Sequence, residues 1–202
     1  MVEIEYKNTR VRLGASDLVY EPAEDSFLLA EAALEETEPG MCILEVGAGS
    51  GFVSAVLKSN IIGIRVFATE INPYAARCAK ANGVEVVRTD LFRGIKPESR
   101  GACFDLILFN PPYLPTSEEE KVPGWLNYAF DGGMSGRETL DRFLDEVRDY
   151  LKPGGKILVL ISSITGLEVV KKKMEKLGFR VDIVLKKKVS FEELIVIRGK
   201  LV

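Results

Sequence analysis

The sequence lacks histidine and is poor in cysteine. None of its 202 residues is histidine, which excludes reactions that need a histidine base and metal sites built on histidine ligands. The three cysteines, Cys42, Cys78 and Cys103, are too far apart for a Cys-x-x-Cys metal motif, and their odd number does not fit a disulfide framework. We therefore predict buried thiols and no metal site in this chain.

Long hydrophobic runs are also missing. The longest apolar stretches, such as residues 157–161, fall far short of the roughly 18 residues that a membrane helix needs. The N-terminal residues Met-Val-Glu-Ile-Glu-Tyr-Lys include acids and lack the apolar core of a secretory signal. We expect a cytoplasmic protein with no membrane partner.

Neither sign of charge is in large excess. The 27 Lys and Arg residues are outnumbered by 30 Asp and Glu residues, which gives a net charge of −3. Proteins that hold a nucleic-acid backbone unaided usually carry the opposite sign, so a nucleic-acid partner is not expected. The basic runs 171–173 and 186–188 fall in a predicted helix and at a predicted strand end, and both are interpreted as solvent-facing.

Short apolar runs alternate with helical patterns along the chain and are separated by glycine and proline. The predicted strands cover residues 41–46, 66–70, 84–88, 105–110, 156–161, 180–185 and 194–198. The predicted helices cover residues 22–35, 52–57, 73–82, 137–151 and 167–177. This alternation indicates a parallel sheet with helices on both faces, and the last two strands, with no helix between them, are predicted to pair antiparallel.

The predicted fold is therefore α/β and Rossmann-like, in one domain over residues 1–202 with a short N-terminal leader over residues 1–20. Its sheet has seven strands and is mostly parallel, with one antiparallel edge strand. Dehydrogenase sheets do not usually finish on such a pair of strands, whereas the sheets of class I methyltransferases do.

A tight glycine turn, Gly47-Ala-Gly49-Ser-Gly51, follows the first predicted strand. Its glycines let the backbone approach a ligand closely at the head of the next helix. The dinucleotide-binding pattern is Gly-x-Gly-x-x-Gly, and this turn is one residue tighter, with Glu45 just before it. An acid at that position suits the cationic end of a ligand better than a pyrophosphate.

Two further acids end the next two predicted strands, where parallel sheets bind their ligands. Glu70 can accept both hydroxyls of a ribose, and Asp90 can accept the amino group of an adenine. S-adenosylmethionine carries a sulfonium cation, a ribose and an adenine but no phosphate, so it matches this set of acids. We predict that it is the cofactor, held by Glu45, Gly47, Gly49, Gly51, Glu70, Ile71, Asp90, Leu91 and Asn110.

The segment Asn110-Pro111-Pro112-Tyr113 is the most specific pattern in the chain. Its prolines lack N–H donors and cannot extend the preceding strand, so they stiffen the loop and leave carbonyl oxygens available. The Asn110 side-chain oxygen and the Pro111 carbonyl can accept both N–H bonds of one –NH₂ group, which turns its lone pair toward a methyl donor without a strong base. We predict that Asn110, Pro111 and Tyr113 are catalytic, that Pro112 helps to bind the substrate, and that Tyr113 stacks on a planar acceptor.

From about Tyr20 to the C-terminus the sequence resembles the Asn-Pro-Pro-Tyr amino-methyltransferases, and among them the HemK-type release-factor glutamine methyltransferases. The motif Gly132-Gly-Met-Ser-Gly-Arg-Glu, followed by Asp141-Arg-Phe, is similar to that of the short archaeal and eukaryotic branch. The motifs that carry the resemblance are Pro22-Ala-Glu-Asp-Ser, Leu44-Glu-Val-Gly-Ala-Gly-Ser-Gly, Thr69-Glu-Ile-Asn-Pro, Thr89-Asp-Leu, Phe109-Asn-Pro-Pro-Tyr and Gly132-Gly-Met-Ser-Gly-Arg-Glu.

The resemblance implies methylation of the glutamine amide in the Gly-Gly-Gln loop of a class I translation release factor. It also implies a small zinc-binding activator subunit as a partner. It implies that Asn110 and Tyr113 hold the glutamine, and that the cofactor is contacted by Ser26, Glu45, Gly47, Glu70, Asp90 and Leu91. Ser26 and Glu70 stand where the family often has threonine and aspartate, and each retains the hydroxyl or carboxylate.

Other functions remain open at this point. The same tetrapeptide serves adenine-N6 methylation of DNA or RNA, although the negative charge and the lack of a target-recognition domain argue against it. Protein lysine methylation is a further alternative for the acceptor. A non-catalytic subunit that only binds the cofactor would have no need of Asn110-Pro-Pro-Tyr.

Overall fold

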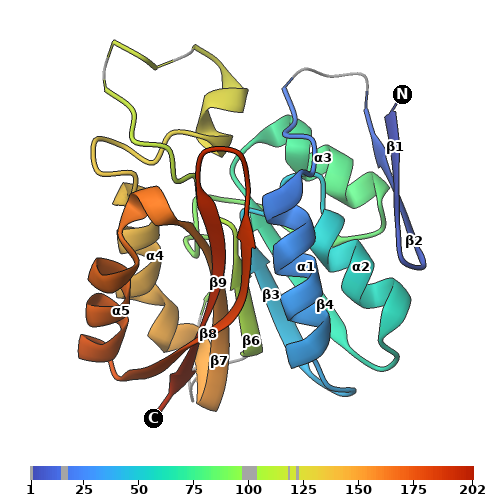
Figure 1. Ribbon diagram of the computed structural model, residues 1–202. Coiled ribbons are helices and arrows are strands. Elements are labelled where there is room, and N and C mark those ends of the chain that lie inside the picture. The colour runs from blue at the N-terminus through green and yellow to red at the C-terminus, as the bar shows by residue number, and fades with distance from the viewer. Residues whose placement is uncertain (1, 15–17, 97–103, 118, 122) are drawn as a thin grey trace.

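A computed structural model describes residues 2–14, 18–96, 104–117, 119–121 and 123–202 (Figure 1). Seven strands form the main sheet in the spatial order β5-β4-β3-β6-β7-β9-β8. In chain order they are β3 (Cys42–Val46), β4 (Arg65–Glu70), β5 (Glu85–Arg88), β6 (Phe104–Phe109), β7 (Leu151–Ser162), β8 (Phe179–Lys188) and β9 (Glu193–Leu201). The neighbours from β5 to β7 are parallel, whereas β9 is antiparallel to both β7 and β8. The predicted fold is confirmed, with the reversed strand β9 one position inside the edge strand β8.

Helices cover both faces of this sheet, as predicted. They are α1 (Glu24–Glu36), α2 (Phe52–Asn60), α3 (Pro73–Ala81), α4 (Glu138–Val147) and α5 (Leu167–Lys176). The first three lie on one side of the sheet, and α4 and α5 lie on the other (Figure 1). The prediction that α4 extends to residue 151 is wrong, because residues 148–150 form a 3-10 turn and Leu151 pairs with Phe104 in the sheet.

The central strands are continuous apolar runs because both of their faces are buried. Along β6, Leu106 and Leu108 point into the core beneath α1 and α2, whereas Ile107 and Phe109 point into the core beneath α4 and α5. All four side chains are at most 2% exposed. The two cores hold the sheet rigidly, which fixes the positions of the loops at its carboxyl edge.

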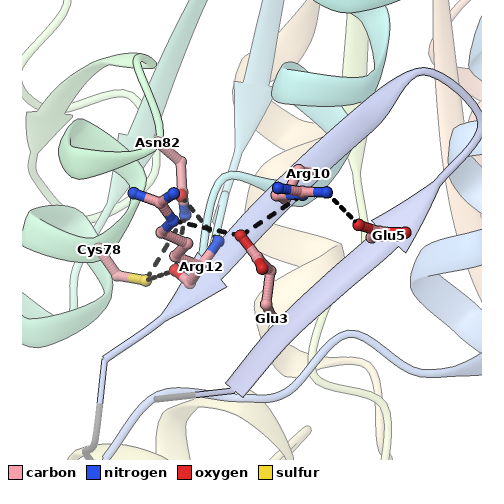
Figure 2. A network of polar contacts seen from close by, with 6 residues as sticks. All are labelled: Glu3, Glu5, Arg10, Arg12, Cys78 and Asn82. Atoms are coloured by element: carbon pink, nitrogen blue, oxygen red, sulfur yellow. Dashed lines mark hydrogen bonds and ion pairs between the residues drawn. The ribbon is translucent and has the colours of Figure 1, made fainter.

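The N-terminal leader contains a β-hairpin that the sequence analysis did not predict. It consists of β1 (Val2–Tyr6) and β2 (Thr9–Leu13), which pair antiparallel. The alternation of polar and apolar residues in 2–6 and 9–13 is the signal for these strands. Ion pairs across the hairpin join Glu3 to Arg10 at 3.5 Å and Glu3 to Arg12 at 3.2 Å (Figure 2).

The hairpin is fixed to the body of the protein at the end of α3. The Asn82 side chain accepts a hydrogen bond from the Arg12 backbone N–H at 3.0 Å and donates one to the Arg12 carbonyl at 3.1 Å (Figure 2). Val11 and Leu13 lie on the face of β2 opposite to the exposed Arg12 side chain and are buried in the core beneath α1 and α2. The hairpin therefore packs as part of the α/β fold.

The structure also bears on the predictions for cysteines and membrane segments. Cys42 and Cys78 are both buried, as predicted, and Cys103 lies outside the described residues. Within the described part of the chain, no helix has the length and apolar character required to cross a membrane.

Candidate active site

A cavity of about 790 Å³ lies at the carboxyl edge of the sheet. The strand order reverses between β3 and β6, so the loops that follow these two strands diverge and leave a crevice between them. The cavity is lined by the loops after β3, β4, β5 and β6, by the first turn of α1 and by the short 3-10 helix η1 (Trp125–Ala129). Residues that are distant in the sequence therefore meet in one site.

Most of the predicted site residues line this cavity: Ser26, Glu45, Gly47, Gly49, Glu70, Ile71, Asp90, Leu91, Asn110 and Pro112. Gly51, Pro111 and Tyr113 are not among the described lining residues. A Cβ atom on Gly51 would lie 2.9 Å from Val84 and 3.0 Å from Ala79. This glycine is therefore needed for close packing of α2 against the α3–β5 region.

The turn after β3 brings backbone to the floor of the cavity. Gly47 and Gly49 have φ angles of 65° and 55°, in the left-handed region that glycine adopts readily. A Cβ atom on Gly47 would lie 3.3 Å from the ring of Phe109. The Ala48 N–H donates to the Thr69 carbonyl at 3.0 Å, which ties the turn to the end of β4. A side chain at Gly47 would therefore strain the turn.

Glu45 is a buried acid at the end of β3, and only 4% of it is exposed. Its Oε2 accepts a hydrogen bond from the Ser54 N–H at 2.9 Å and another from the Ser54 hydroxyl. Burial, together with a smaller effect of the Glu70 charge, raises the pKa of Glu45 to about 7 against the effect of the Ser54 hydrogen bonds. A cationic group in the cavity would favour the charged form of this carboxyl.

Glu70 ends β4 and is held by backbone N–H groups. Its Oε2 accepts from Gly49 at 2.7 Å and its Oε1 accepts from Asn72 at 2.8 Å. Burial raises the pKa of Glu70 even though these hydrogen bonds favour the ionised form. The carboxylate is fixed in place at the turn, where a ligand with two adjacent hydroxyls can donate to it.

The loop after β5 supplies Asp90 and Leu91. Arg142 of α4 donates to Asp90 Oδ2 at 2.6 Å, and Arg93 lies 3.5 Å from the same oxygen. Both ion pairs therefore involve Oδ2 and orient the carboxylate beside the cavity. Leu91 has a φ angle of 47°, which is unusual for a residue with a side chain, and it is buried.

Asn110 follows β6 and lines the cavity, and its side-chain oxygen is an unsatisfied acceptor. Its Nδ2 donates to Asp25 Oδ2 at 2.9 Å. Its Oδ1 is buried and has no hydrogen-bond partner among the described residues. A buried polar atom without a partner costs about 1–3 kcal/mol, so this oxygen is expected to accept a hydrogen bond from a bound molecule.

Asp25 is a site residue that the sequence analysis missed. It lies in the first turn of α1, lines the cavity and is only 5% exposed. Its Oδ1 accepts hydrogen bonds from the Tyr20 hydroxyl at 3.0 Å and from the Ser26 N–H at 2.6 Å. Because an acid is common in the first turn of any helix, nothing in the sequence indicated that Asp25 contacts Asn110.

The loop after Asn110-Pro-Pro-Tyr is held by the segment 130–136. Leu114 donates to the Phe130 carbonyl at 3.0 Å and accepts from the Gly132 N–H at 2.9 Å. A Cβ atom on Gly136 would lie 2.7 Å from the Tyr113 carbonyl. The glycines of this segment therefore let it pack directly on the backbone that carries Tyr113, although Tyr113 itself is half-buried outside the cavity lining.

The donor set fits the predicted cofactor. Two buried carboxylates, Glu45 and Glu70, lie on either side of the glycine turn, and burial raises the pKa of each. A ligand with a cationic end would relieve the unfavourable charge of Glu45, and a ribose would satisfy Glu70. Asn110, whose Oδ1 is unsatisfied, lines the same cavity as this pair.

Comparison with known proteins agrees with this geometry. Residues 24–123 match the family described as the methyltransferase small domain. The chain is 43% identical to a Methanocaldococcus jannaschii protein whose name provisionally makes it a protein N5-glutamine methyltransferase, over 94% of this chain and 95% of that one. It is 41% identical to the mouse methyltransferase HEMK2, over 92% and 91% of the two chains.

The solved structures give the same result. A chain of the E. cuniculi Mtq2–Trm112 complex, described as responsible for methylation of the translation termination factor eRF1, has a TM-score of 0.74 and 28% identity. The match covers 92% of this chain and 99% of that one. Fold and site thus define a class I, S-adenosylmethionine-dependent methyltransferase. Within that class, the chain belongs to the HemK-type family of protein N5-glutamine methyltransferases, in the branch that includes HEMK2 and Mtq2.

Proposed function

We propose that this enzyme methylates the side-chain amide nitrogen of the glutamine in the Gly-Gly-Gln loop of a class I release factor. The observation that carries the proposal is the buried, unsatisfied Oδ1 of Asn110. An acceptor at this position suits a substrate nitrogen that carries hydrogens. The fission yeast relative, 30% identical over 94% of this chain, is named as the catalytic subunit of an eRF1 methyltransferase. The proposed action on translation termination would take place in the cytoplasm.

The cofactor would be held by the part of the cavity that Glu45, Glu70 and Asp90 line, which we call the cofactor half. S-adenosylmethionine supplies an electrophilic methyl group on a sulfonium centre. Glu45, in its charged form, would bind the ammonium group of the methionine end, and Glu70 would accept the ribose hydroxyls. Asp90 would accept the adenine amino group, and the turn at Gly47 would allow close approach of the backbone. Ser26, Gly49, Ile71 and Leu91 would complete the walls.

The acceptor nitrogen would be held at the end of β6. Asn110 Oδ1 would accept one N–H of the glutamine amide, and the carbonyl of Pro111, which lies between the lining residues Asn110 and Pro112, would accept the other. These two acceptors favour a pyramidal nitrogen whose lone pair points into the cofactor half of the cavity. The N–CH₃ bond would form as the S–CH₃ bond breaks, which would leave a neutral thioether and a positively charged amide nitrogen. No basic side chain is required, because this nitrogen is strongly acidic and would release its proton to water. Pro112 and Tyr113 would flank the glutamine.

The cofactor preference can be measured directly. We expect micromolar binding of S-adenosylmethionine and of its demethylated product, and no measurable binding of NAD, because Glu45 and Glu70 would repel a pyrophosphate. Calorimetry on the purified chain measures all three. Trp125, the single tryptophan, lines the cavity, so its fluorescence gives an independent titration. Tight NAD binding without binding of the methyl donor would contradict the assignment.

The acceptor is tested by methyl transfer to a panel of substrates. We expect incorporation into the folded release factor and none into its Gln→Ala variant, histone-type lysine substrates or adenine-containing DNA. A free short peptide is expected to be a poor substrate, because the folded factor presents the loop. Label that persists in the Gln→Ala variant, or that appears preferentially in DNA, would reject glutamine as the acceptor.

We also propose a small zinc-binding activator subunit as partner. The E. cuniculi structure is a complex of Mtq2 with Trm112. In the present fold β5 is an edge strand, and Val87 on it is 49% exposed. An open strand edge with an exposed apolar side chain suits pairing with a partner strand. The substrate panel is therefore measured with and without such a subunit.

A further inference from the structure

The Asn110 amide has a carboxylate on the side away from its unsatisfied oxygen. Asp25 Oδ2 accepts from Asn110 Nδ2 at 2.9 Å, across 85 residues of sequence. Asp25 Oδ1 is occupied separately by Tyr20 and Ser26. The two oxygens of one buried carboxylate therefore accept hydrogen bonds from different partners, and Oδ2 accepts from Asn110.

We propose that Asp25 is a positioning residue that fixes the orientation of the Asn110 amide for methyl transfer. An asparagine side chain can turn over and exchange its oxygen and its –NH₂ group at little steric cost. In the turned orientation Asn110 Oδ1 would face the Asp25 carboxylate, which is acceptor-only when ionised. The orientation with Nδ2 toward Asp25 and Oδ1 away from it is thereby selected before any substrate binds. This inference rests on the proposed role of Asn110 as the amide acceptor.

The charge of Asp25 also strengthens the acceptor. A hydrogen bond from the –NH₂ group to a carboxylate polarises the amide and shifts electron density toward Oδ1. The effect is retained because Asp25 is only 5% exposed and is screened little by water. Oδ1 is therefore expected to bind an N–H donor more strongly than the oxygen of an isolated amide would.

The burial of Asp25 is difficult to explain by helix formation alone. Glu24 also lies in the first turn of α1, is exposed and pairs with Lys187, so it already supplies the acid that favours a helix start. Burying a second carboxylate is unfavourable unless it is well hydrogen-bonded. Tyr20 donates to Asp25, and the pKa of Tyr20 is raised by its burial and by the Asp25 charge, so its hydroxyl remains a donor.

The decisive variant is Asp25→Asn, which keeps the shape and removes the charge. Its amide can donate to Asn110 Oδ1 and so favours the turned orientation. We expect kcat for the release factor to fall about 10–100-fold, as for a misplaced reacting group. The Kd for S-adenosylmethionine and the KM for the release factor should stay within a few-fold. In an Asn110→Ala background the same substitution should cost no further activity, because there is no amide to orient.

Glu24→Gln is the matched control on the neighbouring residue and should retain full turnover. Tyr20→Phe removes one donor from Asp25 and leaves the Asp25–Asn110 bond, so it should lower kcat only a few-fold. In the Asn110→Ala background Tyr20→Phe should not lower kcat any further. If Asp25→Asn does not fold, Tyr20→Phe takes its place as the test. A loss of kcat that adds to that of Asn110→Ala, or an unchanged kcat in the variant tested, would overturn the proposal.

A measurement without substrate separates this proposal from the proposed function. The side-chain amide of Asn110 gives a pair of ¹H–¹⁵N signals, identified by their loss in Asn110→Ala. We expect these signals to shift in Asp25→Asn, and in Tyr20→Phe to a lesser degree, and to be unchanged in Glu24→Gln. Shifts in Asp25→Asn together with no methylation of any release factor would reject the substrate and keep the orienting bond. Unchanged signals with active wild-type enzyme would reject the role of Asp25.

Discussion

Asn110→Ala is expected to lower turnover by about 10²–10³-fold while the Kd for S-adenosylmethionine stays within a few-fold. This is the usual cost of removing one preorganised polar contact to a reacting group. The alanine removes the buried Oδ1 that we propose as the acceptor of the substrate N–H, and leaves Glu45 and Glu70, the proposed cofactor ligands, in place. Single-turnover methylation of the release factor measures the chemical step, and calorimetry measures the cofactor affinity.

Asp90→Ala gives the opposite pattern and serves as the control. It removes the carboxylate that Arg142 orients beside the cavity, so the cofactor Kd should rise first and turnover at saturating cofactor should change less. The two variants thus separate binding from chemistry. If Asn110→Ala retains near-full turnover on the true substrate, Asn110 is not the acceptor of the amide N–H.

Glu45→Gln is expected to weaken S-adenosylmethionine binding by about 10²-fold, the range for loss of a hydrogen bond between charged groups. Burial raises the pKa of Glu45 to about 7 in the folded apoprotein. The wild-type affinity should therefore improve as the pH rises from 6 to 8 and Glu45 ionises. The affinity of the variant should lack this rise. Calorimetry at the two pH values tests both statements.

The same substitution should stabilise the apoprotein at alkaline pH. The pKa of Glu45 is raised on folding from 4.5 to about 7. Below about pH 4.5 Glu45 is neutral in both states, and its contribution to stability is fully present. That contribution is lost as the pH rises toward 7, because the unfolded chain ionises first, and the total loss is on the order of 3 kcal/mol. Glu45→Gln removes this loss. The free energy of unfolding of the variant should therefore exceed that of the wild type by more at pH 8 than at pH 5.

Glu36→Gln is the matched control for this effect. Burial opposes the ionisation of Glu36, but Lys156 at 2.8 Å and Arg198 at 2.6 Å hold the pKa of its carboxyl below the usual value. Its removal should therefore destabilise the protein at pH 8, with the opposite sign to Glu45→Gln. Urea unfolding of both variants at pH 5 and pH 8 measures the difference. A Glu45→Gln variant less stable than wild type at pH 8 would show that Glu45 has no unfavourable charge to lose.

The local sequence carried enough information for most of the main sheet. The runs around Leu44 and Ile107 read as buried strands because both faces of a central parallel strand are covered, and glycine or proline follows each of them. The end of α4 was predicted poorly, because Leu151 leaves the helical pattern to pair with Phe104, a contact made by a distant part of the chain. The hairpin β1–β2 was missed although its alternation was present in residues 2–13.

The sequence by itself determined the chemistry of the cavity, since acids at strand ends, a tight glycine turn and Asn110-Pro-Pro-Tyr are local patterns whose positions follow from the fold. Only the tertiary structure decided which groups touch. Asp25 is 85 residues from Asn110 and resembles any acid at a helix start, yet packing of α1 beside the end of β6 brings the two within a hydrogen bond. Burial likewise makes Glu45 titrate near neutral pH, because desolvation depends on everything packed around the carboxyl and not on its neighbours in sequence.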